Sequence, residues 1–360
     1  MLSWDESVFK NEDVFDPDYV PEVLLHREQQ LNQLAANVMP ALKGNSPINT
    51  LCLGPPATGK TSTILYILSQ VGDKIESVYV RCPAYGTTYK ILARIFEVVC
   101  KHQAPQTGIS HVKLYEKIME KLDKPLIVVL DDINFVSIDV VNELLYLLLK
   151  SPEEYGVKLG IIAAATDIKF SLALNPEVGA IFHYTTVYYP LYGYDEIRDI
   201  LRWRVEHGFV KGAFSEEAFE RVVELTVESA DLRFGIYLLR AAGHNAERRG
   251  SRKVELQDVE AVYTGGAKVF LAKSISALNS DEREMLRLIY LLEGEVAAGD
   301  LYRFFQKEVG ISYQRFYEIL NKLERLRLID FVFDKKGRGR TRYIYKRYDP
   351  DVVLEALREF

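Results

Sequence analysis

The sequence is poor in cysteine and has no long apolar run. Its three cysteines, Cys52, Cys82 and Cys100, are odd in number and far apart. This spacing predicts free, buried thiols in a reducing compartment and argues against disulfides or a zinc site. No apolar run reaches membrane-spanning length, and the acidic N-terminal segment lacks the basic and apolar regions of a signal peptide. We therefore expect a cytoplasmic protein rather than a secreted or membrane-embedded one.

An excess of positive charge is also absent. Lys and Arg number 45 against 51 for Asp and Glu, so the formal net charge is −6 at pH 7. This balance argues against a uniformly basic nucleic-acid-binding surface but is compatible with a local basic patch. With 48% hydrophobic and 27% charged residues in 360, the composition is that of a soluble globular protein with two or three domains.

Apolar strands and helical patterns alternate between about residues 21 and 190. Near-continuous apolar strands separated by helices predict an α/β fold, a parallel sheet covered by helices. The expected strands are residues 48–54, 77–82, 125–132, 158–165 and 183–189. Residues 1–20 are expected to form an extended N-terminal arm.

No strand pattern follows directly after Pro190. Residues 191–270 carry four amphipathic patterns, the last ending near Tyr263, and predict an all-helical domain. Residues 271–360 combine helices near 279–293, 297–309 and 312–327 with two strands around a Gly/Arg-rich turn. Three helices followed by a two-stranded hairpin are the pattern of a winged helix-turn-helix domain.

The most specific motif is GPPATGKT at residues 54–61, between an expected strand and an expected helix. Its glycines let backbone N–H groups surround phosphates, and the helix N-terminus adds its dipole. Lys60 is expected to reach the terminal phosphates and Thr61 to ligate Mg²⁺, so the expected cofactors are ATP or ADP with Mg²⁺. The residues expected to bind the nucleotide here are Pro56, Ala57, Thr58, Gly59, Lys60, Thr61 and Ser62.

Polar residues at later positions complete the expected site. Four apolar residues precede Asp131, which is placed to hold Mg²⁺ directly or through water. The next strand ends in Thr166 and Asp167, expected to orient water or the γ-phosphate, with capping of the following helix as the alternative. Arg233, near a helix start, is expected to contact bound phosphate, with a solvated surface arginine as the alternative.

Together these features resemble an AAA+ ATPase and, more narrowly, the archaeal origin-recognition/Cdc-type replication initiators. The resemblance covers roughly residues 15–360. It rests on YVPEVLLHREQQL at 19–31, GPPATGKT at 54–61, VVLDDI at 128–133, AATDIKF at 164–170, YDEIRDILRWR at 194–204, ADLRFGIYLLR at 230–240 and GRGRTR at 337–342.

The resemblance implies an AAA+ core with an initiator-specific insertion at about 85–102, a helical lid and a C-terminal winged-helix domain. It assigns Val20, Pro21, His26 and Arg27 to the adenine and the insertion to DNA. It further implies double-stranded origin DNA as a partner, other initiator subunits and a replicative helicase as further partners, and association with the nucleoid.

Three departures from that family bear on hydrolysis. Asp132 stands where Glu usually polarises the attacking water, and an ångström of displacement can cost ~10²-fold in rate. Thr166 replaces the usual Asn of the first sensor. Residues 175–183 contain no Arg or Lys to act as a finger on a neighbour's γ-phosphate, a contribution worth ~10³–10⁵. We expect slow hydrolysis that depends on Asp132, Thr166 and Arg233, with nucleotide acting mainly as a conformational ligand.

The expected helix 312–327 has an apolar face and a polar face. Phe316, Ile319, Leu320, Leu323 and Leu326 form the stripe expected to face the core. The polar face is expected to enter the major groove, with a solvated face as the alternative. The residues expected to contact DNA from this helix are Gln314, Arg315 and Lys322.

The hairpin after this helix is strongly basic. Seven Lys and Arg residues lie between Asp334 and Tyr348, and two glycines let its tip approach a backbone or groove. A solvated charge run is the alternative, but in a net acidic chain the cluster favours duplex binding. The residues expected to contact DNA here are Lys335, Lys336, Arg338, Gly339, Arg340 and Arg342.

The expected function is an ATP/ADP-switched initiator that binds origin DNA and assists loading of a replicative helicase. An ATP-responsive winged-helix transcription regulator and an accessory initiator paralogue are the alternatives. An active remodelling ATPase is disfavoured by Asp132 and the missing finger. A nucleotide kinase is disfavoured because no acceptor-binding domain is evident.

Overall fold

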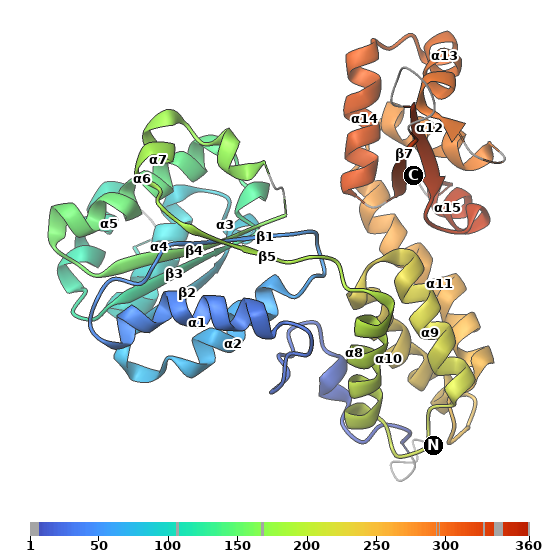
Figure 1. Ribbon diagram of the computed structural model, residues 1–360, viewed down its shortest axis with the longest axis horizontal. Helices are drawn as coiled ribbons and strands as arrows, with labels where there is room; N and C mark the ends of the chain where they lie inside the picture. Colours follow the sequence, from blue (N-terminus) through green and yellow to red (C-terminus); the bar gives the residue numbers. More distant parts are fainter. Residues whose placement is uncertain are drawn as a thin grey trace. The chain divides into compact units, whose positions relative to one another are not determined.

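The computed structural model describes residues 7–105, 108–166, 169–292, 294, 296–326, 328–334 and 341–358. The chain forms two compact units, Val20–Tyr192 and a second unit made of Met1–Tyr19 with Gly193–Phe360 (Figure 1). The first unit is therefore inserted into the second, and the chain passes between the two units twice. Within the described ranges, every helix is too short or too polar to span a lipid bilayer.

The unit Val20–Tyr192 contains a five-stranded parallel sheet. The strands are β1 (Thr50–Leu53), β2 (Glu76–Arg81), β3 (Leu126–Asp131), β4 (Leu159–Ala165) and β5 (Thr185–Tyr188), in the order β2-β3-β4-β1-β5. Each neighbouring pair is parallel. β1, β3 and β4 are buried along their whole length, as expected for strands covered on both faces. The five predicted strands and the α/β fold are confirmed.

Helices cover both faces of this sheet (Figure 1). Residues of α1 (Glu28–Leu42) and α2 (Lys60–Gln70) form one buried cluster with Ile127 and Val129 of β3. Residues of α4 (Thr88–Cys100), α5 (His111–Lys121) and α6 (Ile138–Tyr155) form the other cluster with Val128 and Leu130. Successive residues of β3 thus point to opposite layers, which is why the strand reads as a continuous apolar run.

Short elements complete this unit. The helical segment expected near 85–102 is present as α4, preceded by α3 (Cys82–Tyr85). The other short elements are η2 (Gly72–Lys74), η3 (Ile133–Phe135), η4 (Phe170–Ala173) and α7 (Pro176–Ile181). The cysteines are free thiols, with Cys52 and Cys82 buried and Cys100 half-buried. Burial raises the pKa of the Cys52 thiol to about 12, so it is uncharged at neutral pH.

Four helices follow in the second unit. They are α8 (Tyr194–Gly208), α9 (Glu216–Ser229), α10 (Leu232–Arg248) and α11 (Leu256–Ser276). The last helix continues well past Tyr263, where its sequence pattern fades, and the expected domain boundary at 270 falls inside it. The helix α11 packs against α9, α10 and the C-terminal α15 (Pro350–Leu357). Its sequence contains two adjacent glycines, which disfavour helix on their own, so tertiary packing outweighs local propensity here.

The described part of the N-terminal arm packs on these helices, so the expectation of an extended arm is wrong there. Val14 and Phe15, in the short helix η1 (Glu12–Phe15), are buried. The Phe9 ring stacks on Phe209 with their centroids 4.9 Å apart. A Cβ at Gly208 would lie 2.2 Å from the Phe15 ring, so α8 has a glycine where the arm approaches most closely. Apolar contact over a long sequence separation outweighs the polar, acidic character of the segment.

Charged contacts reinforce the same packing. Glu12 accepts hydrogen bonds from Arg240 Nε at 2.7 Å and from His244 Nε2 at 2.9 Å. Arg240 Nη1 also binds the Asp16 carboxylate at 2.8 Å. Burial raises the pKa of the Glu12 carboxyl, but its contacts with Arg240 and His244 outweigh burial and lower the pKa overall. The arm is therefore an integral part of the second unit.

The C-terminal part of this unit is a winged helix. Its helices are α12 (Ser280–Leu291), α13 (Ala298–Val309) and α14 (Tyr313–Arg325), as the sequence predicts. Its sheet has three antiparallel strands in the order β6-β8-β7: β6 (Val296–Ala297), β7 (Ile329–Asp334) and β8 (Thr341–Lys346). The sequence analysis missed β6, which has two residues, and the final helix α15.

Replacing Phe15 by alanine is expected to lower the free energy of unfolding of the second unit by roughly 3–5 kcal/mol, because a buried ring is lost and a cavity remains. Both tryptophans of the chain, Trp4 and Trp203, belong to this unit. Tryptophan fluorescence during urea denaturation therefore measures its unfolding.

The control for this variant is Val210→Ala. Val210 is 48% exposed, and its N–H donates to the arm at Val8. Truncating its side chain is expected to change stability by no more than about 0.5 kcal/mol. Equal stabilities of the two variants would contradict the burial of the arm.

Candidate functional site

The loop between β1 and α2 has two residues in the left-handed backbone region and a glycine at its start. Gly59, the N-cap of α2, has φ +85°, and Ala57 has φ +60°. A Cβ at Gly54 would lie 2.2 Å from the Tyr189 carbonyl oxygen, so the loop starts where β5 passes too close for any side chain. The predicted strand, the loop at 54–61 and the predicted helix after it are thus all present, in the arrangement that exposes a helix N-terminus to an anion.

Lys60 is held against the carbonyl groups of this loop. It is 6% exposed. Its Nζ donates to the carbonyl oxygens of Gly54 at 2.8 Å and Pro55 at 2.7 Å. The Thr58 hydroxyl donates to the Pro55 carbonyl at 2.8 Å. The predicted residue Pro56 lies within the same turn, and Ser62 lies in the first turn of α2.

Thr61 and Asp131, the two predicted metal ligands, lie against each other. Asp131 is the last residue of β3 and is 2% exposed. Its Oδ2 accepts from the Thr61 hydroxyl at 2.8 Å and from the Tyr79 hydroxyl at 2.7 Å. Its Oδ1 accepts from the Asp132 backbone N–H at 3.1 Å. Carboxylate and hydroxyl oxygens are the ligand type that Mg²⁺ prefers, so these residues fit the implied ion.

Tyr79 is a site residue that the sequence analysis missed. It lies on β2, which pairs with β3 in the register Arg81↔Asp131, two residues further along both strands. Burial and the hydrogen bond to Asp131 raise the pKa of its hydroxyl, which stays protonated and keeps donating at neutral pH. A tyrosine in a strand has no distinctive sequence signal, because only the register of β2 with β3 brings it to the carboxylate.

The Arg27 guanidinium joins three segments beside the loop. Its Nε donates to the Thr58 carbonyl and its Nη2 to the Pro190 carbonyl, both at 2.9 Å. Its Nη1 donates to the His26 carbonyl at 2.6 Å. Its Cζ lies 3.7 Å from the centre of the Tyr192 ring, a cation–π contact. The sequence analysis expected Arg27 at the adenine and did not anticipate these backbone partners.

The other residues expected at the adenine lie on the same segment. Pro21 is buried, and Val20 and His26 are half-buried ahead of α1. His26 has φ +60°, in the left-handed region that few residues other than glycine adopt. The structure thus connects this segment to the phosphate loop through Arg27 and Thr58, and the base contacts stay a prediction.

Asp132 and Thr166 lie at the ends of neighbouring strands. Asp132 follows β3 with φ +55° and turns the chain into η3. There the side chain of Asn134 makes two hydrogen bonds to Thr166, which follows β4. Asn134 is a second residue that the sequence analysis missed, although a polar residue just beyond a strand-end acid is a usable signal. Asp167 lies outside the described residues.

Arg233 belongs to the second unit and sits at the start of α10. Its Nε and Nη2 bind the two carboxylate oxygens of Asp231, the N-cap residue, at 3.0 and 2.7 Å. The predicted contact of Arg233 with phosphate stays a prediction.

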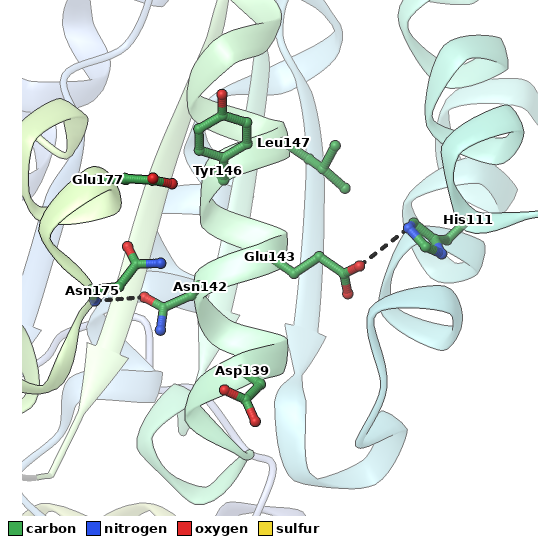
Figure 2. A pocket seen from close by; sticks show the side chains of 8 residues that line it. All are labelled: His111, Asp139, Asn142, Glu143, Tyr146, Leu147, Asn175 and Glu177. Carbon is green, nitrogen blue, oxygen red and sulfur yellow. Dashed lines mark hydrogen bonds and ion pairs between the residues drawn. The ribbon is translucent and has the colours of Figure 1, made fainter.

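A cavity of about 420 Å³ lies between α5, α6 and α7 (Figure 2). Glu143 accepts a hydrogen bond from Thr88 of α4, and its Oε1 lies 3.2 Å from His111 Nε2. Asn142 accepts from the Asn175 backbone N–H at 3.0 Å. These contacts connect α6 with α4, with α5 and with the N-cap residue of α7. The lining contains none of the residues that the sequence analysis predicted for a site.

In the winged helix, α14 buries most of its predicted stripe. Phe316, Ile319, Leu320 and Leu323 are fully buried, and Leu326 is half-buried. The packing of α14 onto the domain is therefore as the sequence predicts.

Two of the residues expected to contact DNA from α14 have an internal partner. Lys322 Nζ lies 2.5 Å from Glu282 Oε2, and Arg315 Nη2 lies 3.4 Å from Glu282 Oε1. Glu282 is buried, which raises its pKa, but these cations and a backbone contact outweigh burial and lower the pKa overall. Gln314 is exposed and its amide donates to Glu318 at 3.3 Å.

The described basic residues of the hairpin make contacts within the winged helix. Lys346 donates to the Leu292 carbonyl, and Arg347 Nε binds Asp330 at 2.9 Å. Arg342 Nη1 donates to Asn321 of α14 at 3.0 Å. The remaining residues predicted to contact DNA lie outside the described residues: Lys335, Lys336, Arg338, Gly339 and Arg340.

Comparison with known proteins gives matches along the whole chain. Residues 46–181 match an AAA domain and residues 198–264 match a Cdc6 AAA+ ATPase-type lid domain. ORC1-type DNA replication protein 2 of Archaeoglobus fulgidus is 53% identical over 359 residues, covering 99% of this chain and 95% of that protein. ORC1-type DNA replication protein 6 of Halobacterium salinarum is 38% identical, with 99% and 98% covered.

Solved structures show the same architecture. The Aeropyrum pernix ORC1 protein in complex with DNA has a TM-score of 0.69 at 27% identity, covering 98% of this chain and 97% of that one. The Aeropyrum pernix ORC2 protein in ADPNP–ADP complexes has a TM-score of 0.77 at 21% identity, with 98% of both chains covered. At 21% identity, the similarity to the ORC2 protein concerns the fold alone.

Replacing Arg27 by alanine is expected to destabilise the unit Val20–Tyr192 by roughly 2–3 kcal/mol, because the Thr58 and Pro190 carbonyls lose a charged donor. Since both tryptophans belong to the other unit, far-UV circular dichroism during urea denaturation is the measurement. The matched control is Arg94→Ala. Arg94 lies 3.7 Å from Glu97 in an exposed ion pair, whose loss is expected to cost no more than about 0.5 kcal/mol. Equal unfolding midpoints and slopes for the two variants would refute the structural role of Arg27.

Proposed function

The chain belongs to the archaeal ORC1-type/Cdc6 family of replication initiators, and on that premise we propose that it is an ATP/ADP-switched initiator that binds double-stranded origin DNA. Its AAA+ core and lid make it a nucleotide-binding protein by family.

The pairing of Thr61 with Asp131 at the end of the phosphate loop carries this proposal. The hydroxyl and the carboxylate are 2.8 Å apart, and the helix that begins at Lys60 presents its N-terminus to the same loop. We assign Lys60 to the terminal phosphates and Thr61 and Asp131 to Mg²⁺, which would screen the phosphate charge when bound. Residues 56–62 surround the phosphates, and Val20, Pro21 and His26 line the base.

Slow hydrolysis follows from the residues beside this pair. Asp132 has a short side chain and a left-handed backbone conformation. The helix α7, in the segment where related ATPases carry a finger, contains no Arg or Lys. A site that binds nucleotide well and hydrolyses it slowly acts as a switch, and Arg233 of the lid is the proposed reader of the bound phosphate.

We propose that the winged helix carries the duplex-binding surface. Its topology, the basic hairpin and the complex of the Aeropyrum pernix ORC1 relative with DNA support this assignment. The proposed contacts are Gln314, Arg342 and the hairpin tip at residues 335–340. Arg315 and Lys322 share Glu282 and so hold α14 onto α12. The helices α3 and α4 after β2 are the proposed second contact, and helicase loading with other initiator subunits is the proposed outcome.

DNA binding is expected to weaken with salt in proportion to the phosphates contacted. Neutralising about 3–5 phosphates predicts a slope of log K against log salt of roughly −3 to −4.5. Fluorescence anisotropy on a duplex from the source genome's replication origin, with ATP, with ADP and without nucleotide, measures this slope and the effect of nucleotide.

Replacing Lys335, Lys336, Arg338 and Arg340 together by alanine is expected to flatten that slope, whereas Arg94→Ala is expected to leave it unchanged. A slope near zero in the wild-type protein would refute the DNA assignment, and identical affinities in all three nucleotide states would refute the switch. Chromatin footprints at promoters instead of origins would identify a transcription regulator.

Wild-type turnover is expected to stay well below about 1 s⁻¹, the low end of typical enzymes. Asp132→Glu is expected to raise it by up to about 10²-fold, because the longer side chain extends the carboxylate by roughly an ångström. Release of phosphate from γ-labelled ATP is the measurement, and Lys60→Ala controls for contaminating ATPases. Wild-type turnover of about 1 s⁻¹ or more would refute the slow-switch assignment.

A further inference from the structure

The carboxamide of Asn134 has only one orientation that satisfies Thr166. The Thr166 backbone N–H lies 2.9 Å from one end of the carboxamide, and a backbone N–H can only donate. That end must therefore be the oxygen Oδ1. The other end, the NH₂ group, then lies 2.9 Å from the Thr166 hydroxyl oxygen and donates to it. The backbone of Thr166 thus fixes the direction of both hydrogen bonds.

The direction of the second bond determines the role of the hydroxyl. Because Thr166 Oγ1 accepts from Asn134, its own proton cannot be directed at Asn134. A hydroxyl has one proton to donate, so this proton is available to an acceptor on another side. The hydrogen bond from Asn134 thereby orients the Thr166 hydroxyl as a donor.

The oriented hydroxyl lies at the end of the sheet where the phosphate loop begins. Thr166 directly follows Ala165, whose carbonyl accepts from the Gly54 backbone N–H at 3.4 Å, and Gly54 is the first residue of the loop. Asn134 reaches this position because the left-handed backbone of Asp132 turns the chain into η3, which packs against β4. The strand ends that carry Asp131 and Thr166 are neighbours in the sheet.

We propose that Asn134 positions the Thr166 hydroxyl as the hydrogen-bond donor that distinguishes ATP from ADP. The inference rests on the proposed nucleotide site. ATP differs from ADP by its γ-phosphate, which is the strongest acceptor that either nucleotide brings to this end of the sheet. In this arrangement the carboxamide sits on the loop after β3, and the group that contacts phosphate is the threonine after β4. Asn134 is a positioning residue, and it acts only through Thr166.

The decisive variant is Asn134→Asp, which keeps the shape of the side chain. One carboxylate oxygen still accepts from the Thr166 N–H, but the other now accepts the Thr166 hydroxyl proton and draws it away from the nucleotide. Thr166→Val removes the hydroxyl at nearly constant volume. The two variants therefore remove the same donor in different ways, one of them without changing charge.

Asn142→Asp is the matched control, because it makes the same chemical change and adds the same charge at another position. Asn142 also accepts a backbone N–H through Oδ1, from Asn175 at 3.0 Å, and it lies on α6 in the lining of the cavity between α5, α6 and α7. Its substitution is expected to leave nucleotide binding unchanged.

Calorimetric titration of nucleotide-depleted protein with ADP and with a non-hydrolysable ATP analogue gives the ratio of the two affinities, independently of turnover. Thr166→Val and Asn134→Asp are each expected to lower the ATP-to-ADP ratio by about tenfold or more, the usual worth of a hydrogen bond to a charged group. Thr166→Ser, which keeps the hydroxyl, is expected to retain a higher ratio than Thr166→Val. The double variant is expected to lose little beyond either single one, since both act on one donor.

Three results would overturn this inference while the wild-type protein still binds both nucleotides through Lys60. One is an unchanged ratio in Thr166→Val. Another is equal weakening of both nucleotides, which is the behaviour of a purely structural contact. The third is an effect of Asn134→Asp that is as large in the Thr166→Val variant as in the wild-type protein, because it would then come from repulsion between the new carboxylate and the phosphate. If instead the wild-type protein binds neither nucleotide, or Lys60→Ala changes neither affinity, the proposed function itself is wrong and this inference falls with it.

Discussion

The nucleotide-binding unit depends on one buried cation. The Arg27 guanidinium, 2% exposed, binds the carbonyl of Thr58 in the phosphate loop and the carbonyl of Pro190 beyond β5, and it lies against the Tyr192 ring. A buried charge is tolerated only when its donors are satisfied, so these segments are held in one relative geometry. The chain crosses between units directly after Tyr192 and directly before the segment that leads to Arg27. Within this unit, the phosphate loop and the segment after β5 are therefore held by the same side chain.

Hydroxyl groups make the main side-chain contacts at the ends of β3 and β4. Asp131 accepts from the hydroxyls of Thr61 and Tyr79, so its carboxylate is fixed by neutral donors from α2 and β2. Neutral donors hold the carboxylate in place without cancelling its charge, which leaves it able to attract a cation. The hydroxyl of Thr166, held by Asn134, adds a third oriented group at the next strand end. Asp131 and Thr166 are thus held at neighbouring strand ends by side chains from other elements.

The sequence predicts the parts of this arrangement that local patterns encode. The five strands are apolar runs, the loop is a contiguous motif, and Thr61 meets Asp131 because a helix start and a strand end must converge at one edge of a parallel sheet. The contacts of Tyr79 and Arg27 depend instead on which segments lie side by side in the folded unit. Tyr79 needs the register of β2 against β3, and the Arg27 partners are main-chain carbonyls, one of them 163 residues away. Main-chain acceptors carry no residue-type signal, so no pattern could have identified them. Lys322 is a third case: its partner Glu282 is a side chain 40 residues away, and only the packing of α14 on α12 brings the two together.

Apolar packing fixes the N-terminal arm to the lid helices of the second unit. Burial of Val8, Val14 and Phe15 against the second unit contributes about 1.5–3 kcal/mol for each side chain, whereas coupling between two sites typically amounts to about 1–3 kcal/mol. A coupling of that size cannot detach the arm, because the sum of these burials is larger. The arm therefore stays packed on the lid helices, where Phe9 stacks on Phe209 and Glu12 accepts a hydrogen bond from Arg240. Its polar, acidic sequence gives no sign of this, because the partners of its few apolar side chains come from helices about 200 residues further along the chain.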